Sequence, residues 1–158
     1  MKVSLWMTFI ISCDHWSWGL VSMTTKIDLN KDIIVPNKKA AGVKLGAKKE
    51  TIKKNWGKPI EIEKISSKVE RWGYENVNFW LVSGKVDQIS LCNLYEGKTK
   101  EGVGLGSTKT EVEKVYGPLE WDGSWHIQIP PFGIGFDFIS EIIGEQFVSE
   151  VYVFMEYY

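Results

Sequence analysis

Few side chains in this sequence have the types and spacing that chemistry requires. Cys13, Asp14 and His15 are consecutive and carry atoms that can ligate a metal, but His126 is the only other histidine. A zinc site needs about four ligands, and no second cluster supplies the rest. A Ser-His-Asp or Cys-His arrangement would have to use one of these histidines, and no recognisable motif surrounds either. We therefore expect no metal site and no cofactor.

A glycine-rich stretch superficially resembles a phosphate-binding loop. It reads Gly102-Val-Gly-Leu-Gly-Ser-Thr-Lys109 and lacks the Gly-Lys-Ser/Thr ending. A matching segment earlier in the chain has Ala47-Lys48 at the same place, so the start of a helix is the better interpretation. Carboxylates are plentiful, yet nothing picks out a pair for general acid–base catalysis. The sequence thus predicts that the protein is not an enzyme.

Charge is distributed unevenly along the chain. Residues 1–90 hold 15 Lys+Arg against 9 Asp+Glu, a net of +6, whereas residues 91–158 hold 4 against 11, a net of −7. An acidic surface attracts a basic partner and repels phosphate backbones, which argues against nucleic acid. The basic and aromatic segment at 48–71 places its lysines where a solvated helix face is expected. A solvated acidic face that only keeps the protein soluble is an equal alternative.

The amino terminus allows two interpretations. Its apolar side chains occupy every second position, as in a half-buried strand: Val3, Leu5, Met7, Phe9 and Ile11. The same segment ends in Ile-Ile-Ser-Cys13, which resembles the lipidation signal of a lipoprotein. We favour the strand. In the alternative, residues 1–12 are a signal segment and Cys13 is a lipidation site. No apolar run approaches the ~18–20 residues that cross a bilayer.

The cysteine content fits an intracellular protein. Cys13 and Cys92 could pair only if the fold brought them together, and two cysteines make no disulfide framework. Free thiols are the simpler account. The predicted location is therefore the cytoplasm, and a membrane-anchored lipoprotein is the alternative.

One segment of the sequence occurs twice. Gly42–Gly57 aligns without gaps on Gly102–Gly117, with seven of sixteen positions identical. Each copy predicts a glycine turn followed by a helix of two to three turns. A left-handed glycine cap ends the helix, and the proline after it prevents continuation. Thr108 and Glu111 form a capping box in the second copy. We expect an amino-terminal strand and linker at 1–40, repeat 1 at 41–97 and repeat 2 at 98–158, forming one continuous domain.

Alternating strands follow each predicted helix. Asn76–Val82 and Lys85–Leu91 flank the tight turn Ser83-Gly84, and further strands are predicted at 70–74, 125–129, 133–139 and 147–154. The predicted fold class is α+β, with two tandem helix-plus-antiparallel-sheet repeats and the helices on one face of the sheet. The opposite face is then open to solvent.

Alternation also predicts which side chains this open face carries. They combine aromatic rings with carboxylates: Asn78, Trp80, Asp137, Glu150, Tyr152 and Phe154. Aromatic side chains rimmed by charge are typical of protein-binding surfaces. In the alternative, the amino-terminal strand or Met155–Tyr158 covers the face and Trp80 belongs to the core.

The repeat resembles two groups of proteins. The pattern that carries the resemblance is Gly-Val-x-Leu-Gly, followed by Val or Ile, then Trp/Tyr-Gly and Pro. One is the SmpA/OmlA family of small lipoproteins, and the other is the beta-lactamase inhibitory protein group, whose tandem repeats form a helix-backed sheet with an aromatic binding face. The second resemblance implies that Trp80, Asp137, Glu150 and Tyr152 form an inhibitory surface. We therefore predict an immunity protein that neutralises a bacterial toxin or enzyme, with a basic toxin or nuclease as partner. The alternatives are an envelope lipoprotein scaffold anchored through Cys13 and a module that binds a small ligand in an aromatic groove.

Overall fold

The computed structural model describes residues 28–119, 126–140 and 144–155. These ranges contain nine strands, two α-helices and the short 3-10 helices η1 (Leu29–Lys31) and η2 (Pro130–Phe132). The predicted strand at 1–12 and Cys13 lie outside the described residues, so neither interpretation of the amino terminus is tested.

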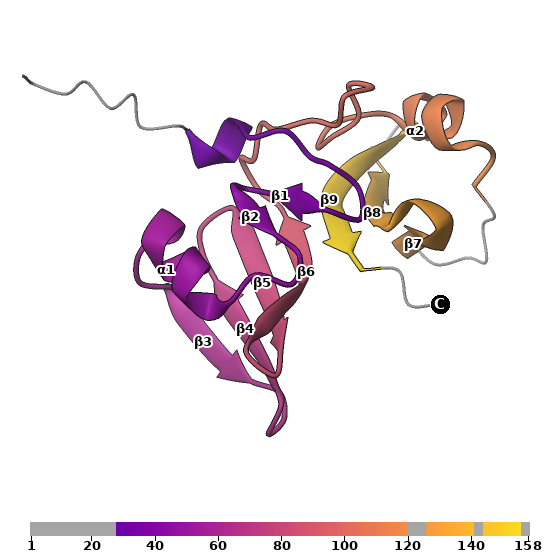
Figure 1. Ribbon diagram of the computed structural model, residues 1–158. Helices are drawn as coiled ribbons and strands as arrows, with labels where there is room; N and C mark the ends of the chain where they lie inside the picture. The colour runs from indigo at the N-terminus through magenta and orange to yellow at the C-terminus, as the bar shows by residue number, and fades with distance from the viewer. Residues whose placement is uncertain (1–27, 120–125, 141–143, 156–158) are drawn as a thin grey trace, which may run out of the picture.

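Seven of the nine described strands form one antiparallel sheet, with the strand order β3-β4-β5-β6-β9-β8-β7 (Figure 1). Its strands are β3 (Glu61–Lys64), β4 (Val69–Gly73), β5 (Val77–Val82), β6 (Lys85–Leu91), β7 (His126–Ile129), β8 (Ile134–Ser140) and β9 (Gln146–Phe154). A separate hairpin pairs β1 (Lys39–Ala40) with β2 (Val43–Lys44). Every strand predicted between residues 70 and 154 is present to within one residue at each described end. The α+β class is confirmed.

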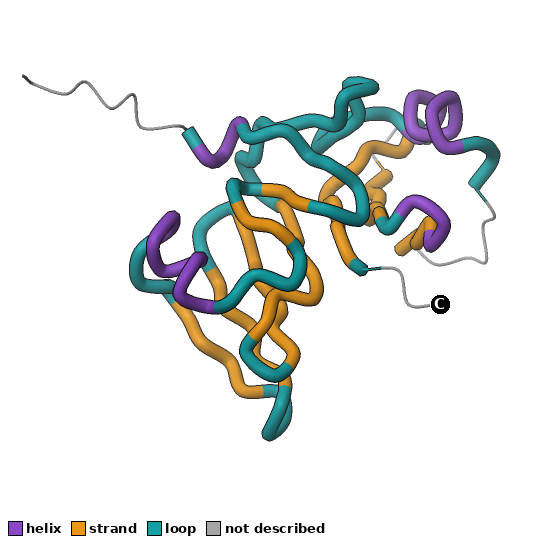
Figure 2. The backbone as a smooth tube through the Cα atoms, viewed as in Figure 1, coloured by secondary structure: helices purple, strands orange, loops and turns teal. Residues whose placement is uncertain are grey.

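Local turn chemistry and a long-range pairing together build the sheet. Ser83 and Gly84 join β5 to β6 with φ angles of 50° and 77°, the left-handed pair that a tight hairpin requires. After β6, a long loop carries the chain to α2 (Lys109–Tyr116), as Figure 2 shows. The chain then returns to β6 through β9, where Ile89 pairs with Val153. That pairing makes one sheet out of the two halves of the chain.

The two helices start differently. In α2 the Thr108 hydroxyl accepts a hydrogen bond from the Glu111 amide at 3.2 Å, and the Glu111 carboxylate accepts one from the Thr108 amide at 2.8 Å. The predicted capping box is therefore confirmed. In α1 (Lys49–Trp56) the residue before the helix is Lys48, and no side chain caps the start.

Both helices end at glycine, but without the predicted left-handed cap. Gly57 has φ 76° and ψ −148°, and Gly117 has φ 88° and ψ 176°. Positive φ with extended ψ is a conformation that essentially only glycine adopts. Here the chain leaves the helix extended, on its way to Pro59 and Pro118, rather than turning back on itself. The prediction that each helix ends at glycine was correct, and the predicted left-handed geometry of the cap was wrong.

Both helices pack on the same face of the sheet. A row of buried residues crosses the strands, Phe79 to Ile89 to Val153 to Ile134. Trp56 of α1 packs edge-on against Phe79, with 6.2 Å between the ring centroids. From α2, Tyr116 packs against Phe136 at 5.7 Å, and Phe136 lies on the same face as Ile134. Neither helix is long or apolar enough to cross a bilayer.

The edge strand β3 was not predicted. All four of its residues are exposed, so it has no buried face to produce an apolar alternation. Its pairing with β4 is supported by charge instead, because Arg71 bridges Glu61 and Glu63 at 2.9 Å each. Charged side chains of this kind also protect a sheet edge from pairing with other chains.

Candidate functional site

The face of the sheet opposite the helices, called here the outer face, carries all the residues predicted to bind a partner. Register places them in adjoining rows that cross the strands. One row is Asn78, Ser90, Tyr152, Gly135 and Gln128; a second is Arg71, Trp80, Gln88 and Phe154; a third is Glu150, Asp137 and His126. Asn78, Trp80, Asp137, Glu150, Tyr152 and Phe154 are all half-buried. Within the described ranges, no helix packs on this face.

Trp80 is held in a defined position by its neighbours in the sheet. Its indole N–H donates to the Ser90 hydroxyl at 3.3 Å, and the Gln88 amide donates to the same oxygen at 3.4 Å. Ser90 is only 1% exposed because these side chains lie over it. The indole ring is therefore fixed on the surface before any partner arrives.

A second network fixes Tyr152. Its hydroxyl donates to one carboxylate oxygen of Asp137 at 2.5 Å, while the Nδ1 atom of His126 lies 2.5 Å from the other. The Gln128 amide nitrogen lies 3.1 Å from the Nε2 atom of His126. The imidazole also packs edge-on against the Tyr152 ring at 4.9 Å. Asp137 thus orients two rings on neighbouring strands.

Burial raises the pKa of two groups in this network. Burial is the largest cause that raises the pKa of Glu150, and the charge of Asp137 raises it further. Burial and the hydrogen bond to Asp137 raise the pKa of Tyr152 far above its ordinary value. Glu150 is thus partly removed from water beside the carboxylate of Asp137, so a cation added there would be stabilised.

Positive charge on the outer face is already neutralised at its β3 edge. Arg71 donates to Glu61 and Glu63, and its remaining nitrogen donates to the Asn78 side chain at 3.2 Å. Asn78 in turn approaches the Cys92 thiol at 4.0 Å. The described face therefore runs from an arginine paired with two carboxylates to an acidic patch at Glu150 and Asp137, where Asp137 contacts His126.

The arrangement does not favour nucleophilic chemistry. Cys92 carries a free thiol whose pKa is raised by burial and by the charge of Glu150, so the reactive thiolate is disfavoured. His126 lies three strands away, about 14 Å at the spacing of ~4.8 Å between strands. Ser90 is buried and already accepts hydrogen bonds. In the part of the chain that the structure describes, no three His, Cys, Asp or Glu residues are grouped to hold a metal.

A hollow adjoins the acidic patch where β8 and β9 are irregular. The register between these strands shifts at Asp137 and Phe138. A pocket of about 490 Å³ opens there, lined by Asp137, Phe138, Ile139, Ser140 and Ser149. Ile139 beside it is 53% exposed. A bulge of this kind re-aims side chains and leaves room for a partner's side chain.

Alternation predicted the aromatic and acidic residues of the outer face but missed their supports. Gln88 and Ser90 lie opposite Trp80 and Asn78 in the register of β5 and β6. The alternation of residues 85–91 could therefore have placed both of them on the outer face. His126 and Gln128 could have been found only with the register of β7 on β8. The role of Arg71 could not be predicted, because its partners Glu61 and Glu63 lie on strand β3, which was itself not predicted. Cys13, the alternative lipidation site, lies outside the described residues.

Comparison with known proteins finds the chain similar to two solved bacterial structures. One is an extracellular protein containing an SCP domain from Bacillus anthracis str. Ames, with 17% identity and a TM-score of 0.45 over 71% of this chain and 44% of that one. The other is a cysteine-rich secretory protein from Staphylococcus aureus subsp. aureus Mu50, with 12% identity and a TM-score of 0.49 over 78% and 50%. The chain thus spans at most half the length of these proteins. No protein-family model and no curated protein matches it.

These findings correct three predictions. The neighbours are neither beta-lactamase inhibitory proteins nor SmpA/OmlA lipoproteins, so the family resemblance was wrong. The immunity-protein function and its lipoprotein alternative are corrected with it, because both were inferred partly from that resemblance. The cytoplasmic location is also corrected, since the neighbours are described as extracellular and secretory.

Proposed function

We propose that this chain is a non-catalytic protein-binding module whose contact surface is the outer face of the sheet. The observation that carries the proposal is the pair of half-buried rings, Trp80 and Tyr152, held by hydrogen bonds on a face where no described helix packs. Tryptophan and tyrosine are the side chains that most often anchor protein interfaces.

Preorganisation supports a binding role for these rings. Association is opposed by the loss of side-chain freedom when an interface forms. Trp80 is already restrained by Ser90, and Tyr152 by Asp137, so little of that loss remains. The exposed side chains of Val82, at 39%, and Ile139, at 53%, extend the apolar contact area around them.

The acidic patch favours a partner with a basic side chain. Glu150 and Asp137 are neighbours across β9 and β8. Asp137 contacts His126, and among the described residues no lysine or arginine forms an ion pair with either carboxylate. A lysine or arginine from a partner would relieve their mutual repulsion and gain a charge-assisted hydrogen bond. The same acidity disfavours nucleic acid as a ligand of this face.

We further infer that the face is assembled from two tandem copies of one unit. Support comes from the identities between Gly42–Gly57 and Gly102–Gly117 and from the position of α1 and α2 ahead of their strands. On this account Trp80 belongs to the first copy and Tyr152 to the second. The contact surface would exist only where β6 meets β9.

Site-specific photocross-linking of the full chain tests the function. A photoreactive phenylalanine analogue replaces Val82 or Ile139 on the outer face, and Leu94, a loop residue 76% exposed, is the matched control. The chain is exposed to proteins from the cells that produce it, and adducts are identified by mass spectrometry. We expect the same protein adduct from Val82 and Ile139 and not from Leu94.

A charge reversal adds specificity to that test. Asp137→Lys should abolish the adduct, because it reverses the acidic patch and removes the acceptor of Tyr152. Glu101→Lys, at an exposed position away from the outer face, makes the same change in net charge and should leave the adduct intact. Equal adducts from all three cross-linking positions, or an adduct insensitive to Asp137→Lys, would count against the proposed surface.

A further inference from the structure

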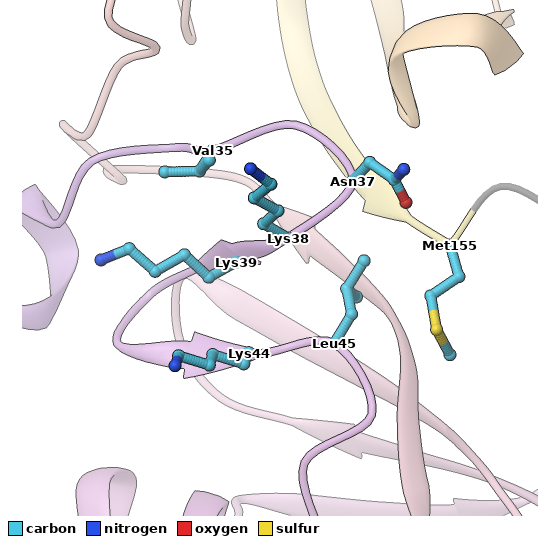
Figure 3. Close-up of a pocket in the computed structure, with 7 residues that line it drawn as sticks. All are labelled: Val35, Asn37, Lys38, Lys39, Lys44, Leu45 and Met155. Carbon is cyan, nitrogen blue, oxygen red and sulfur yellow. The ribbon is translucent and has the colours of Figure 1, made fainter.

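A second site lies on the helix side of the molecule, where the β1–β2 hairpin faces the end of β9. A pocket of about 470 Å³ opens there, lined by Val35, Asn37, Lys38, Lys39, Lys44, Leu45 and Met155 (Figure 3). This volume is in the range of small-molecule sites, about 300–1,000 Å³. No part of the outer face contributes to it.

The pocket is polarised between a cationic side and an apolar side. Figure 3 shows the three lysine nitrogen atoms on one side, together with Val35, and Leu45 and Met155 on the other. Among the described residues, no carboxylate lines the pocket. Lys39 is partly neutralised by Asp32, with 3.4 Å between the charged atoms. No ion pair is recorded for Lys38 or Lys44 with any described carboxylate, so two ammonium groups remain uncompensated.

The hairpin holds these charges together against their repulsion. Lys39 and Lys44 lie directly opposite each other in the register of β1 and β2. Like charges in that position destabilise a strand pair. Asp32 partly offsets the charge of Lys39, and an anion bound beside Lys44 would reduce the repulsion that remains, which gives the site a physical reason to bind one.

The walls of the pocket are fixed by hydrogen bonds to the rest of the fold. At the tip of the hairpin, the Ala41 amide donates to the Tyr95 hydroxyl at 3.1 Å, and the Gly42 amide donates to the Asp32 carboxylate at 2.8 Å. On the opposite wall, the Asn37 amide donates to the Gly133 carbonyl at 3.1 Å. The site therefore needs little rearrangement to accept a ligand.

We propose that this pocket binds a small amphipathic anion, a phosphate or carboxylate head group on a short apolar chain. The head group interacts with the lysine side of the pocket, where Lys38 and Lys44 lie, and the chain lies against Leu45 and Met155. An anion without a chain leaves the apolar side unfilled, and an uncharged chain leaves the lysines uncompensated. Both halves of the ligand are therefore required for full affinity.

Methyl NMR of the full chain tests the proposal with octyl phosphate as the probe. Met155 lines the pocket, so its methyl signal, assigned with Met155→Leu among those of the four methionines, reports on the site directly. We expect a saturable shift of that signal with octyl phosphate. Octanol and inorganic phosphate should each bind about tenfold more weakly, because each makes only part of the contacts.

Charge variants identify the lysines that act. Lys38→Gln with Lys44→Gln should weaken octyl phosphate binding about tenfold, since two charge-assisted contacts are lost. Lys54→Gln with Lys58→Gln removes two exposed lysines outside the pocket and should leave binding unchanged. Equal affinity for octanol, an unmoved Met155 signal, or equal losses in both double variants would overturn the proposal. Binding to phosphatidylglycerol vesicles without binding of octyl phosphate would also overturn it, by assigning the lysines to a lipid surface.

Discussion

Phe79 and Trp80 are adjacent in β5 and point to opposite faces of the sheet, so truncating each to alanine compares the core with the outer face. Phe79 is fully buried and packs against Trp56 and Tyr74, with ring centroids 6.2 and 5.7 Å away. Trp80 is half-buried and makes one side-chain hydrogen bond, to Ser90. The two substitutions should therefore differ in their effect on stability.

The expected magnitudes follow from these surroundings. Phe79→Ala leaves a cavity under α1 and should lower the free energy of unfolding by about 3–5 kcal/mol. Trp80→Ala loses a hydrogen bond worth about 1 kcal/mol. It also loses partial burial of the indole, worth about 1 kcal/mol more. For a chain of this size each kcal/mol shifts the melting temperature by roughly 2–4 °C. We expect a shift of roughly ten degrees for Phe79→Ala and about half of that for Trp80→Ala.

Urea unfolding followed by circular dichroism measures both values, provided the dependence on urea is the same as in the parent chain. A loss for Trp80→Ala as large as for Phe79→Ala would refute the reasoning. It would mean that Trp80 is enclosed on both sides, so the outer face is a second core and cannot be the binding surface.

Three further predictions use the same measurement. Thr108→Ala removes one of the two capping-box bonds with Glu111 and should lower stability by about 1 kcal/mol. Gly133→Ala should lower stability by more than about 2 kcal/mol, because the residue has φ 60° and its new Cβ would lie 2.7 Å from the Phe154 carbonyl oxygen. Glu150→Gln should raise stability at pH 7, because the folded state raises the pKa of Glu150 and so disfavours the ionised form. That gain should fade as the pH falls from the raised pKa of Glu150 through its ordinary value, where the parent carboxyl is protonated in both states.

Each of these outcomes has a clear contrary result. An unchanged stability in Thr108→Ala would mean that the start of α2 contributes nothing to the fold. A neutral Gly133→Ala would contradict the close approach of β8 and the segment before β1. A gain for Glu150→Gln that persists unchanged at acidic pH would show that the effect is not electrostatic, since the charge is then absent from both proteins.

Several parts of the fold follow from short stretches of sequence. The capping box at Thr108, the turn at Ser83 and Gly84, and the alternation of Val77 to Val82 are interactions between residues close in the chain. For that reason their structural consequences could be predicted without knowing the fold. The same alternation placed Trp80 and Tyr152 on the face opposite Phe79, because side chains in a strand alternate strictly.

Contacts between distant residues could not be predicted in this way. The pairing of β6 with β9, the edge strand β3, the Asp137–His126–Tyr152 network and the lysine pocket each depend on segments that approach only in three dimensions. Many registers satisfy the same alternation, and only the closed core selects one of them. The sequence by itself determined the class of the fold, most of its helix and strand positions, and the parity of the outer-face residues. The tertiary structure decided which of those residues touch, because side chains from separate strands become neighbours only once the whole sheet has formed.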